Sequence, residues 1–511
     1  MSIWLAMSPL LTIAIGGMAV MMLDSFFREN TELAAFTTVV LLVSMGLSLA
    51  LWFGGGPVDM PPIVSGYLAT DKMGLLFDVL ICGGGALSTL LAGGYLAEHD
   101  LERGEFYVLT LFSAFGAMVL ARSVDLLSLF LGLETMSLGV YALVGFRRTS
   151  SRSVEGAVKY FLLGSFAAAI LLFGGALLYG ATGHTNFEEI GKVIAAGEAE
   201  VALVSVAILM LIAGLAFKVS AVPFHMWTPD AYEGAITPAT SFMSVAVKSA
   251  AFAVLLRVLL VCFGDEVLRN AYTGWPPVIA AFAAVTMVYG NLAALGQQSV
   301  KRMLAYSSIA HAGYVLVGVC AASKGYVDTG RTLEVGSQSA HVLVNTGMSS
   351  VMYYLMAYTV SNVLVFGSLI LVGSRGKEAV SYEDLAGVGR RHPMVAVPFV
   401  LGVLSLMGFP PTAGFVGKYY VFQAAVSAGG GMVWLAVIGV LSSAVGAYYY
   451  LRVLVFMFMK EPQTNAPVAI PMRSGSVVLA LLVSGYFVLK MGITPASYLQ
   501  FAIEAARQLV A

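Results

Sequence analysis

Charged residues are scarce in this chain. Asp, Glu, Lys and Arg make up 11% of its 511 residues, and 59% of the residues are hydrophobic. A water-soluble protein carries about 25% charged residues. The composition therefore argues against a soluble protein and predicts a polytopic membrane protein. The formal net charge is -1 and no basic run is suited to binding phosphates, so nothing indicates a nucleic-acid partner.

Cysteine is almost absent, since Cys82, Cys262 and Cys320 each lie alone in apolar sequence. An iron-sulfur cluster or a structural zinc normally needs about four ligands at short spacing. The chain also lacks a GxGxxG motif after a strand and a Walker-type phosphate loop. We therefore expect no redox centre, no metal site and no nucleotide site in this chain.

Long apolar segments dominate instead. About twenty apolar residues cross a bilayer as a helix, and this measure predicts an all-α protein with about fourteen transmembrane helices. The first segment lacks a preceding basic region and a convincing cleavage site, so we expect a retained helix rather than a signal peptide. The expected helices are residues 4–23, 34–53, 74–97, 106–122, 125–146, 153–180, 202–229, 238–263, 275–296, 301–321, 344–373, 394–425, 431–459 and 472–492.

Proline interrupts two of these segments, at Pro223 in the seventh and at Pro410 and Pro411 in the twelfth. Proline lacks a backbone donor and clashes with the carbonyl four residues earlier, so we expect both helices to break. A break at membrane depth is tolerated where it lines a polar cavity, and Lys218 precedes the first one, which indicates an ion or proton path. The alternative is a proline kink with a snorkelling lysine, although Lys218 lies far from the charged stretch that ends at Glu200.

An internal repeat matches these breaks. Residues 158–173 resemble residues 352–367 in their paired aromatic and small residues, and a proline-interrupted helix follows each. This pattern predicts two inverted repeats, with a relic of gene duplication as the alternative. We divide the chain into helices one to three (1–105), a first repeat with helices four to eight (106–263), a second repeat with helices nine to thirteen (275–459), and the last helix with a short tail (472–511) that could lie at the membrane interface.

Four ionisable residues lie deep in apolar sequence: Glu134, Lys218, Lys248 and Lys418. A buried carboxylate is costly alone, so we expect Glu134 to pair with Lys218. Lysine, unlike arginine, can lose its proton when it is buried. The four residues therefore predict a proton relay. The alternatives are a packing hydrogen bond for Glu134 and a structural tether for Lys248.

A secondary proton path is predicted at Glu155, Lys159, His225 and His311. Glu155 and Lys159 stand four residues apart and are expected to pair on one helix face. Histidine can carry protons near neutral pH. The alternatives are a solvated charge for Glu155 and ordinary hydrogen-bonded bundle residues for the histidines.

The remaining charges near the segments have simpler interpretations. Arg257 and Arg452 lie towards helix ends, and we expect both to snorkel to the membrane surface. Asp230 and Glu233 follow the first break, where capping of a helix end is the simplest account and guarding of an entrance is the alternative. Asp78 is a further candidate for a functional acid.

Basic residues set the expected orientation. Loops after odd-numbered segments hold the larger share of Lys and Arg, including Arg147, Arg148, Arg390 and Arg391. The positive-inside rule then places these loops in the cytoplasm and both termini on the other side.

Three runs resemble a known family: AGLAFKVSAVPFHMWTPDAYEGAITP, LAYSSIAHAGYVLVG and GFPPTAGFVGKYYVF. They are similar to the antiporter-like membrane subunits N of proton-pumping NADH:quinone oxidoreductase, respiratory complex I, from about residue 70 to residue 460. By this resemblance Glu134, Lys218, Lys248 and Lys418 fall on the family's proton-path residues. Ile236 departs from the proline that is common there, in a loop outside the charge relay.

The resemblance implies a proton-translocating subunit of a bacterial inner membrane whose partners are other membrane-arm subunits, the lipid bilayer and protons. NADH, flavin, iron-sulfur clusters and quinone would be bound by those other subunits, which carry out electron transfer. Two alternatives stay open: a subunit of a multi-component monovalent cation/proton antiporter, and a membrane scaffold that moves no protons.

Overall fold

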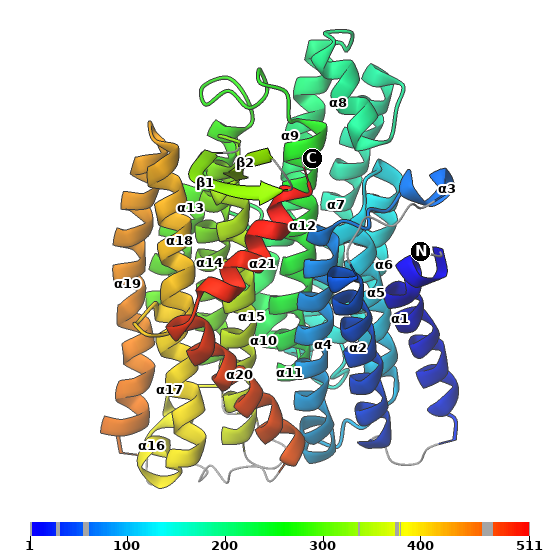
Figure 1. Ribbon diagram of the computed structural model, residues 1–511. Coiled ribbons are helices and arrows are strands. Elements are labelled where there is room, and N and C mark those ends of the chain that lie inside the picture. Colours follow the sequence, from blue (N-terminus) through cyan, green and yellow to red (C-terminus); the bar gives the residue numbers. More distant parts are fainter. Residues whose placement is uncertain are drawn as a thin grey trace.

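The structure is a computed structural model that describes residues 3–26, 31–54, 61–325, 327–335, 338–373, 378, 380–461 and 474–509. It is a bundle of helices that stand side by side (Figure 1). Within the described residues, 13 helical segments are long and apolar enough to cross a membrane. They are α1 (Ile3–Leu23), α2 (Thr31–Phe53), α4 (Lys72–Glu98), α5 (Glu105–Arg122), α6 (Leu126–Val144), α7 (Ser151–Thr182), α9 (Val201–Val219), the run Thr237–Cys262, α13 (Pro276–Leu295), α14 (Val300–Ala322), α15 (Thr346–Val372), α19 (Met432–Met459) and α20 (Gly475–Ile493).

The twelfth predicted segment is the broken helix of the second half. It forms two shorter helices, α17 (Pro393–Met407) and α18 (Ala413–Ala428). With this pair the described bundle agrees with the prediction of about fourteen spans, and the predicted class of polytopic helical membrane protein is confirmed.

Both predicted breaks are present. The helix α9 ends at Ser220, whose φ is 65°, and α10 (Trp227–Gly234) follows after a turn that contains Pro223. The helix α17 ends at Gly408, whose φ is 88°, and α18 begins after Pro410 and Pro411. A left-handed residue commonly closes a helix, because it turns the chain away from the helix axis.

The two broken helices enter the bundle from opposite ends. The helix α8 (Phe187–Ala195), which leads into α9, lies at the upper end of the view, and α16 (Val388–Arg391), which leads into α17, lies at the lower end (Figure 1). This arrangement is what an inverted repeat requires.

Helix starts are capped where the sequence supplies short polar side chains. Asp71, Asp125, Ser150, Ser299 and Asn345 each accept a hydrogen bond from a backbone N–H in the first turn of the helix that follows. Such caps pair donors that the helix itself leaves free and stabilise it by about 1 kcal/mol each.

Small residues let neighbouring helices approach closely. A Cβ on Gly116 of α5 would come 2.3 Å from the backbone nitrogen of Met136, and a Cβ on Gly132 of α6 would come 2.6 Å from that of Leu120. Larger residues at either position would push α5 and α6 apart. The spacing matters because α6 carries Glu134.

The centre of the bundle is formed by the run Thr237–Cys262 with α14 and α15, which are almost wholly buried. The run is not the single regular helix that the sequence predicts. It contains α11 (Thr237–Phe242), the π-helical turn η1 (Met243–Val247), α12 (Lys248–Arg257) and a second π-helical turn, η2 (Val258–Cys262). π-Turns are rare and are frequent at functional sites, and here they flank the helix that begins at Lys248.

Several short elements lie outside the predicted segments. Besides α8 and α16, they are α3 (Pro62–Ser65), the hairpin of β1 (Val327–Val335) and β2 (Gln338–Val344), the 3-10 turn η3 (Glu383–Leu385) and α21 (Ala496–Arg507). In the hairpin, Val327 pairs with Val344 in antiparallel register, so the chain between α14 and α15 is not a simple loop. The helix α21 occupies the predicted tail and runs obliquely across α15 and α4 (Figure 1).

Candidate functional site

Lys218 lies in the last turn of α9, directly before the first break, and is 1% exposed. Its Nζ atom donates hydrogen bonds to Oγ of Ser137 at 2.7 Å and to the Tyr141 hydroxyl at 3.1 Å. It also lies 5.7 Å from the centre of the Tyr160 ring, which adds a cation–π contact. Ser137 is eleven residues into α6, or about 16 Å along its axis, so the ammonium lies deep in the membrane.

Glu134 does not form the expected direct ion pair with Lys218. Ion pairs within 4.0 Å join other residues, and the Glu134 Oε1 atom is buried without a hydrogen-bond partner. Ser137 and Tyr141 follow Glu134 by three and seven residues on the same face of α6. The ammonium is therefore held by two hydroxyl groups of the helix that carries Glu134, and hydroxyls can both accept and donate protons.

Lys248 opens α12 after the π-turn η1 and is 3% exposed. Its Nζ atom donates to the carbonyl oxygen of Ser308 at 2.6 Å and to the Ser308 hydroxyl at 2.5 Å. The same hydroxyl accepts a hydrogen bond from Tyr358 at 2.8 Å and lies 3.4 Å from the hydroxyl of Tyr232 on α10. Ser308 thus connects the lysine to α15 and to the helix that follows the first break.

His311 lies one turn after Ser308 on α14 and is 4% exposed. One ring nitrogen, Nδ1, is 2.6 Å from the hydroxyl of Tyr354, and the other, Nε2, is 3.0 Å from the hydroxyl of Tyr450. A histidine bonded at both nitrogens to hydroxyls can take a proton at one and release it at the other.

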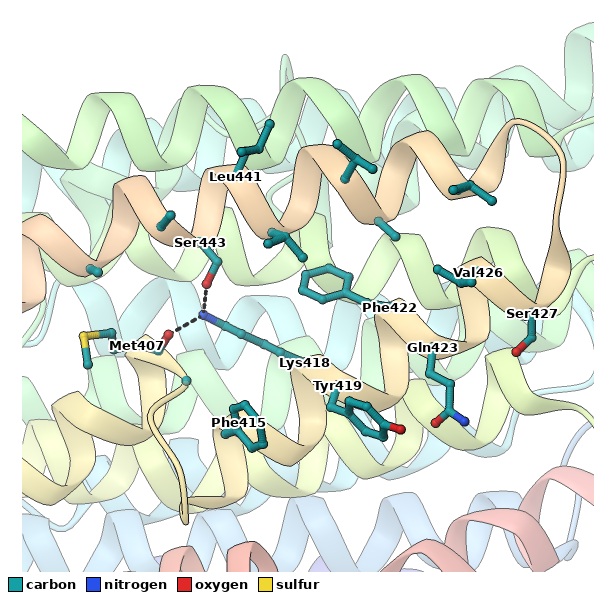
Figure 2. A pocket seen from close by; sticks show the side chains of 17 residues that line it. Met407, Phe415, Lys418, Tyr419, Phe422, Gln423, Val426, Ser427, Leu441 and Ser443 are labelled. Carbon is teal, nitrogen blue, oxygen red and sulfur yellow. Dashed lines mark hydrogen bonds between the residues drawn. The ribbon is translucent and has the colours of Figure 1, made fainter.

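Lys418 follows the second break, in the second turn of α18, and is 7% exposed. Its Nζ atom donates to the carbonyl oxygen of Met407 at 2.9 Å and to the Ser443 hydroxyl at 2.7 Å, and it lies 5.0 Å from the centre of the Tyr314 ring. The side chain lies at the end of a largely apolar pocket of about 880 Å³ between α18 and α19, where Phe422 also projects (Figure 2). Met407 belongs to the last turn of α17, so the break itself supplies an acceptor for the lysine.

One face of α14 contacts both Lys248 and Lys418. Ser308, His311 and Tyr314 occur at three-residue intervals on this helix, and side chains three or four residues apart lie on one helix face. The first binds Lys248 and the last contacts Lys418. This face therefore carries one side chain in contact with each of the two lysines, with His311 between those side chains in the sequence.

Two residues of the predicted secondary path, Glu155 and Lys159, belong to an ion-pair cluster on α7, α10 and α14. Lys159 pairs with Glu155 at 2.6 Å, as its spacing predicts, and also with Asp230 at 2.9 Å. Asp230 in turn accepts from Arg302 at 2.6 Å, and Arg302 also reaches Glu233 at 3.0 Å. Asp230 and Glu233 are therefore paired acids rather than helix caps. Lys159 is 44% exposed, whereas Lys218, Lys248 and Lys418 are deeply buried.

His225 lies in the turn between α9 and α10 and is 8% exposed. Its ring packs edge-on against Tyr289 of α13, with 4.6 Å between the ring centres. The structure thus places His225 at the first break, whereas His311 is near both Lys248 and Lys418.

Arg257 and Arg452, which were expected to snorkel, both bond to groups at the ends of other helices. Arg257 is 2% exposed and binds both carboxylate oxygens of Asp71, at 2.6 and 3.0 Å. Arg452 packs over the Tyr382 ring at 4.4 Å and donates to the Leu295 carbonyl. Each arginine found a partner on another element, which a sequence cannot display.

Two carboxylates near the start of α4 are each held by an arginine. Burial raises the pKa of Asp71, but the Arg257 guanidinium and the Gly74 N–H more than offset this and hold it below its usual range. Asp78 is paired with Arg122, and both side chains are fully buried. Asp78 is therefore part of a salt bridge between α4 and α5 and lies apart from the lysine network.

Sequence reasoning missed the hydroxyl groups that hold the lysines. These are Ser137, Tyr141, Ser308 and Ser443, which are ordinary residues of apolar helices in the sequence. A usable signal existed only on α14, where Ser308 and His311 share one helix face with Tyr314. The other partners come from helices distant in the chain.

Comparison with known proteins places the chain in a family. The family described as NADH:quinone oxidoreductase/Mrp antiporter, transmembrane, matches residues 123–330 and 336–446. The chain is 53% identical to NADH-quinone oxidoreductase subunit N 1 of Sorangium cellulosum, with 98% of each chain covered, and 40% identical to subunit N of Myxococcus xanthus, with 97% of this chain and 96% of that one covered.

Solved structures agree. A chain of respiratory complex I from Thermus thermophilus, solved with bound aureothin, is 32% identical and has a TM-score of 0.77, with 97% of this chain and 99% of that chain covered. The Mrp complex of a Dietzia species has the same fold, at 22% identity, a TM-score of 0.82 and coverage of 99% and 98%. The chain is an integral membrane protein that belongs to the NADH:quinone oxidoreductase/Mrp antiporter family, among relatives named NADH-quinone oxidoreductase subunit N.

Proposed function

We propose that this chain is a proton-translocating membrane-arm subunit of an NADH:quinone oxidoreductase in a bacterial inner membrane, with both termini on the non-cytoplasmic side. Electron transfer from NADH to quinone takes place in partner subunits, which hold the flavin, the iron-sulfur clusters and the quinone. This chain moves protons when that chemistry changes the charge state of its buried groups. The relatives named as oxidoreductase subunit N support this assignment.

The observation that carries the proposal is the bonding of Lys218, Lys248 and Lys418. Each ammonium is buried in the membrane and is held by hydroxyl or carbonyl oxygens. Burial disfavours the charged form of a lysine, while these oxygens can bond to it as an ammonium or as an amine. A lysine in such a place can therefore change its protonation state at moderate free-energy cost, as a proton carrier must.

The proposed path runs through both repeats. Glu134 and Lys218 are coupled by their opposite charges, and Lys248 receives the proton at the centre of the bundle. His311 then carries it along α14 towards Lys418. The exposed cluster around Lys159 serves as a secondary entry, because it lies closer to water than the lysines of the path.

The test is proton uptake by vesicles that contain the chain with its co-purified partners. NADH-dependent quinone reduction and proton uptake are measured together for the native chain, for Lys248→Met and for Lys192→Met, an exposed lysine of α8 that serves as the matched control. We expect Lys248→Met to abolish uptake and Lys192→Met to leave it unchanged. Normal uptake by Lys248→Met would refute the proposed path.

The rival function is a subunit of a multi-component cation/proton antiporter, which the shared fold with the Mrp complex favours. Measurements in the same vesicles distinguish the two functions. A sodium gradient that drives proton movement without NADH, in a preparation lacking quinone reductase activity, would establish the antiporter. Partners that reduce quinone, with no response to sodium, would establish the oxidoreductase.

A further inference from the structure

A second pocket lies far from the lysine path, where α2 ends, α4 begins and α21 crosses them. It has a volume of about 440 Å³, and its walls include Trp52, Phe53, Lys72, Phe501 and Glu504. Phe53 is the last residue of one membrane span and Lys72 is the first residue of another. The pocket therefore lies at the level where the membrane meets water, which aromatic and basic side chains favour.

The pocket presents one charge of each sign. Nζ of Lys72 lies 3.1 Å from a carboxylate oxygen of Glu504, and the two side chains are 30% and 33% exposed. The backbone N–H of Lys72 donates to the Gln508 side chain at 2.8 Å, which fixes α21 against the start of α4. A half-exposed ion pair contributes only about 0 to 1 kcal/mol, so a ligand with matching charges can replace the pair with two new contacts.

Three aromatic rings line the same pocket. The Trp52 and Phe501 ring centres are 5.5 Å apart, and those of Phe53 and Phe501 are 6.1 Å apart. The Lys72 ammonium already lies 5.1 Å from the centre of the Trp52 ring. These rings are therefore suited to hold a cation of a ligand as well.

Away from the pocket, α2 exposes apolar side chains on one face. Phe36, Val39, Val43 and Phe53 are 36%, 55%, 48% and 69% exposed, and they recur at helical spacing on one face. An apolar face that leads away from a charged pocket at the surface matches the shape of a phospholipid, with the head group in the pocket and the acyl chains on the face.

We propose that this pocket binds a phospholipid whose head group carries a phosphate and a primary ammonium. The phosphate lies on Lys72, the ammonium donates hydrogen bonds to Glu504 beside the Phe501 ring, and the acyl chains lie along the exposed face of α2. A purely anionic head group fits less well because Glu504 repels it. The ligand therefore needs a negative and a positive charge, which bind to Lys72 and Glu504 respectively.

The test uses the assembled complex in nanodiscs with a phosphatidylethanolamine that carries a photoactivatable group on an acyl chain. Cross-linked peptides are mapped by mass spectrometry. We expect labels on α2 and α21, and we expect unlabelled phosphatidylethanolamine to compete while phosphatidylglycerol does not. Water-soluble phosphoethanolamine at the same concentration is expected to leave the label in place, because it lacks the acyl chains. These measurements use the native chain and require no variant.

Two variants localise the site. Glu504→Gln should lower the label about fivefold, equivalent to about 1 kcal/mol. Glu189→Gln is the matched control, since it removes a partner of the exposed Lys192 ion pair on α8, and it should leave the label unchanged. Subunit content is measured for both variants so that a loss of assembly is recognised.

Three results would overturn the proposal. Equal competition by phosphatidylglycerol would show that the head group is not recognised. Competition by phosphoethanolamine would assign the pocket to a soluble ligand. Absence of label from α2 and α21 in the native complex would show that a neighbouring subunit covers this surface.

Discussion

Lys248 donates two hydrogen bonds to a single residue, Ser308: its Nζ atom lies 2.6 Å from the carbonyl oxygen and 2.5 Å from the hydroxyl oxygen. The carbonyl can only accept, so it holds the amine in place in either protonation state. The hydroxyl can accept from the lysine and donate onward. Ser308 thus holds Lys248 through its carbonyl oxygen and can exchange a proton with it through its hydroxyl group.

Removal of the Ser308 hydroxyl should separate these two roles. In Ser308→Ala the carbonyl still holds Lys248, so we expect normal assembly, but the link to Tyr358 is lost and NADH-driven proton uptake should fall at least about tenfold, equivalent to about 1.4 kcal/mol. Ser244→Ala is the control, because Ser244 is equally buried and bonds only its own helix. Equal uptake by both variants would show that the hydroxyl is not part of the path.

Substitution of Lys218 distinguishes a proton carrier from a fixed charge. Arginine can still donate to Ser137 and Tyr141 but does not give up its proton, so Lys218→Arg should assemble and fail to pump. Lys218→Ala leaves these two hydroxyls without their donor, which we expect to cost about 1 to 3 kcal/mol in stability in addition to the loss of pumping. Proton uptake and thermal denaturation of the purified complex check both effects. Near-normal pumping by the arginine variant would mean that Lys218 acts only as a charge.

The tyrosines around His311 are expected to act as a pair. Each phenol bonds one ring nitrogen, so Tyr354→Phe or Tyr450→Phe alone should reduce proton uptake partially, and the double variant should stop transfer between Lys248 and Lys418. Tyr486→Phe, on an exposed face of α20, is the control. If the double variant pumps as the native chain does, His311 is a packing residue.

The buried pair of Asp71 and Arg257 should contribute to stability. Asp71→Asn leaves Arg257 without its counter-charge, which typically costs about 3 to 5 kcal/mol. The double variant Asp71→Asn with Arg257→Gln removes the unpaired charge, and we expect it to recover much of the loss. A double-mutant cycle on thermal stability of the complex measures this coupling. Additive losses would show that the two side chains do not interact energetically.

The orientation can be checked with reporters. The helix α7 leads up to α8 at the upper end of the bundle, where the carboxyl end of α21 also lies, so the loop between α6 and α7 is at the opposite end (Figure 1). A reporter after Arg148 should therefore read cytoplasmic, and one at the C-terminus should read external. The reverse result would invert the orientation, and a common side for both would contradict the number of spans.

The sequence by itself determined the class of the protein and the positions of its spans. Apolar segments of about twenty residues must be helices in a bilayer, because a lipid-exposed backbone has no other way to pair its polar groups. Prolines such as Pro223 and Pro410 mark where those helices end, since proline cannot continue the backbone ladder. Lys218, Lys248 and Lys418 were visible because charge in apolar sequence is rare.

Only the tertiary structure decided what each buried charge contacts. Glu134 and Lys218 were expected to pair directly, yet Lys218 bonds to Ser137 and Tyr141 of α6 instead, and Arg257 binds Asp71, the residue that caps α4. These partners are 77 to 186 residues apart in the chain. The periodicity of a sequence indicates which face of a helix is apolar. Which hydroxyl lies beside which ammonium is determined by how the helices cross, and the crossing depends on packing across the whole bundle.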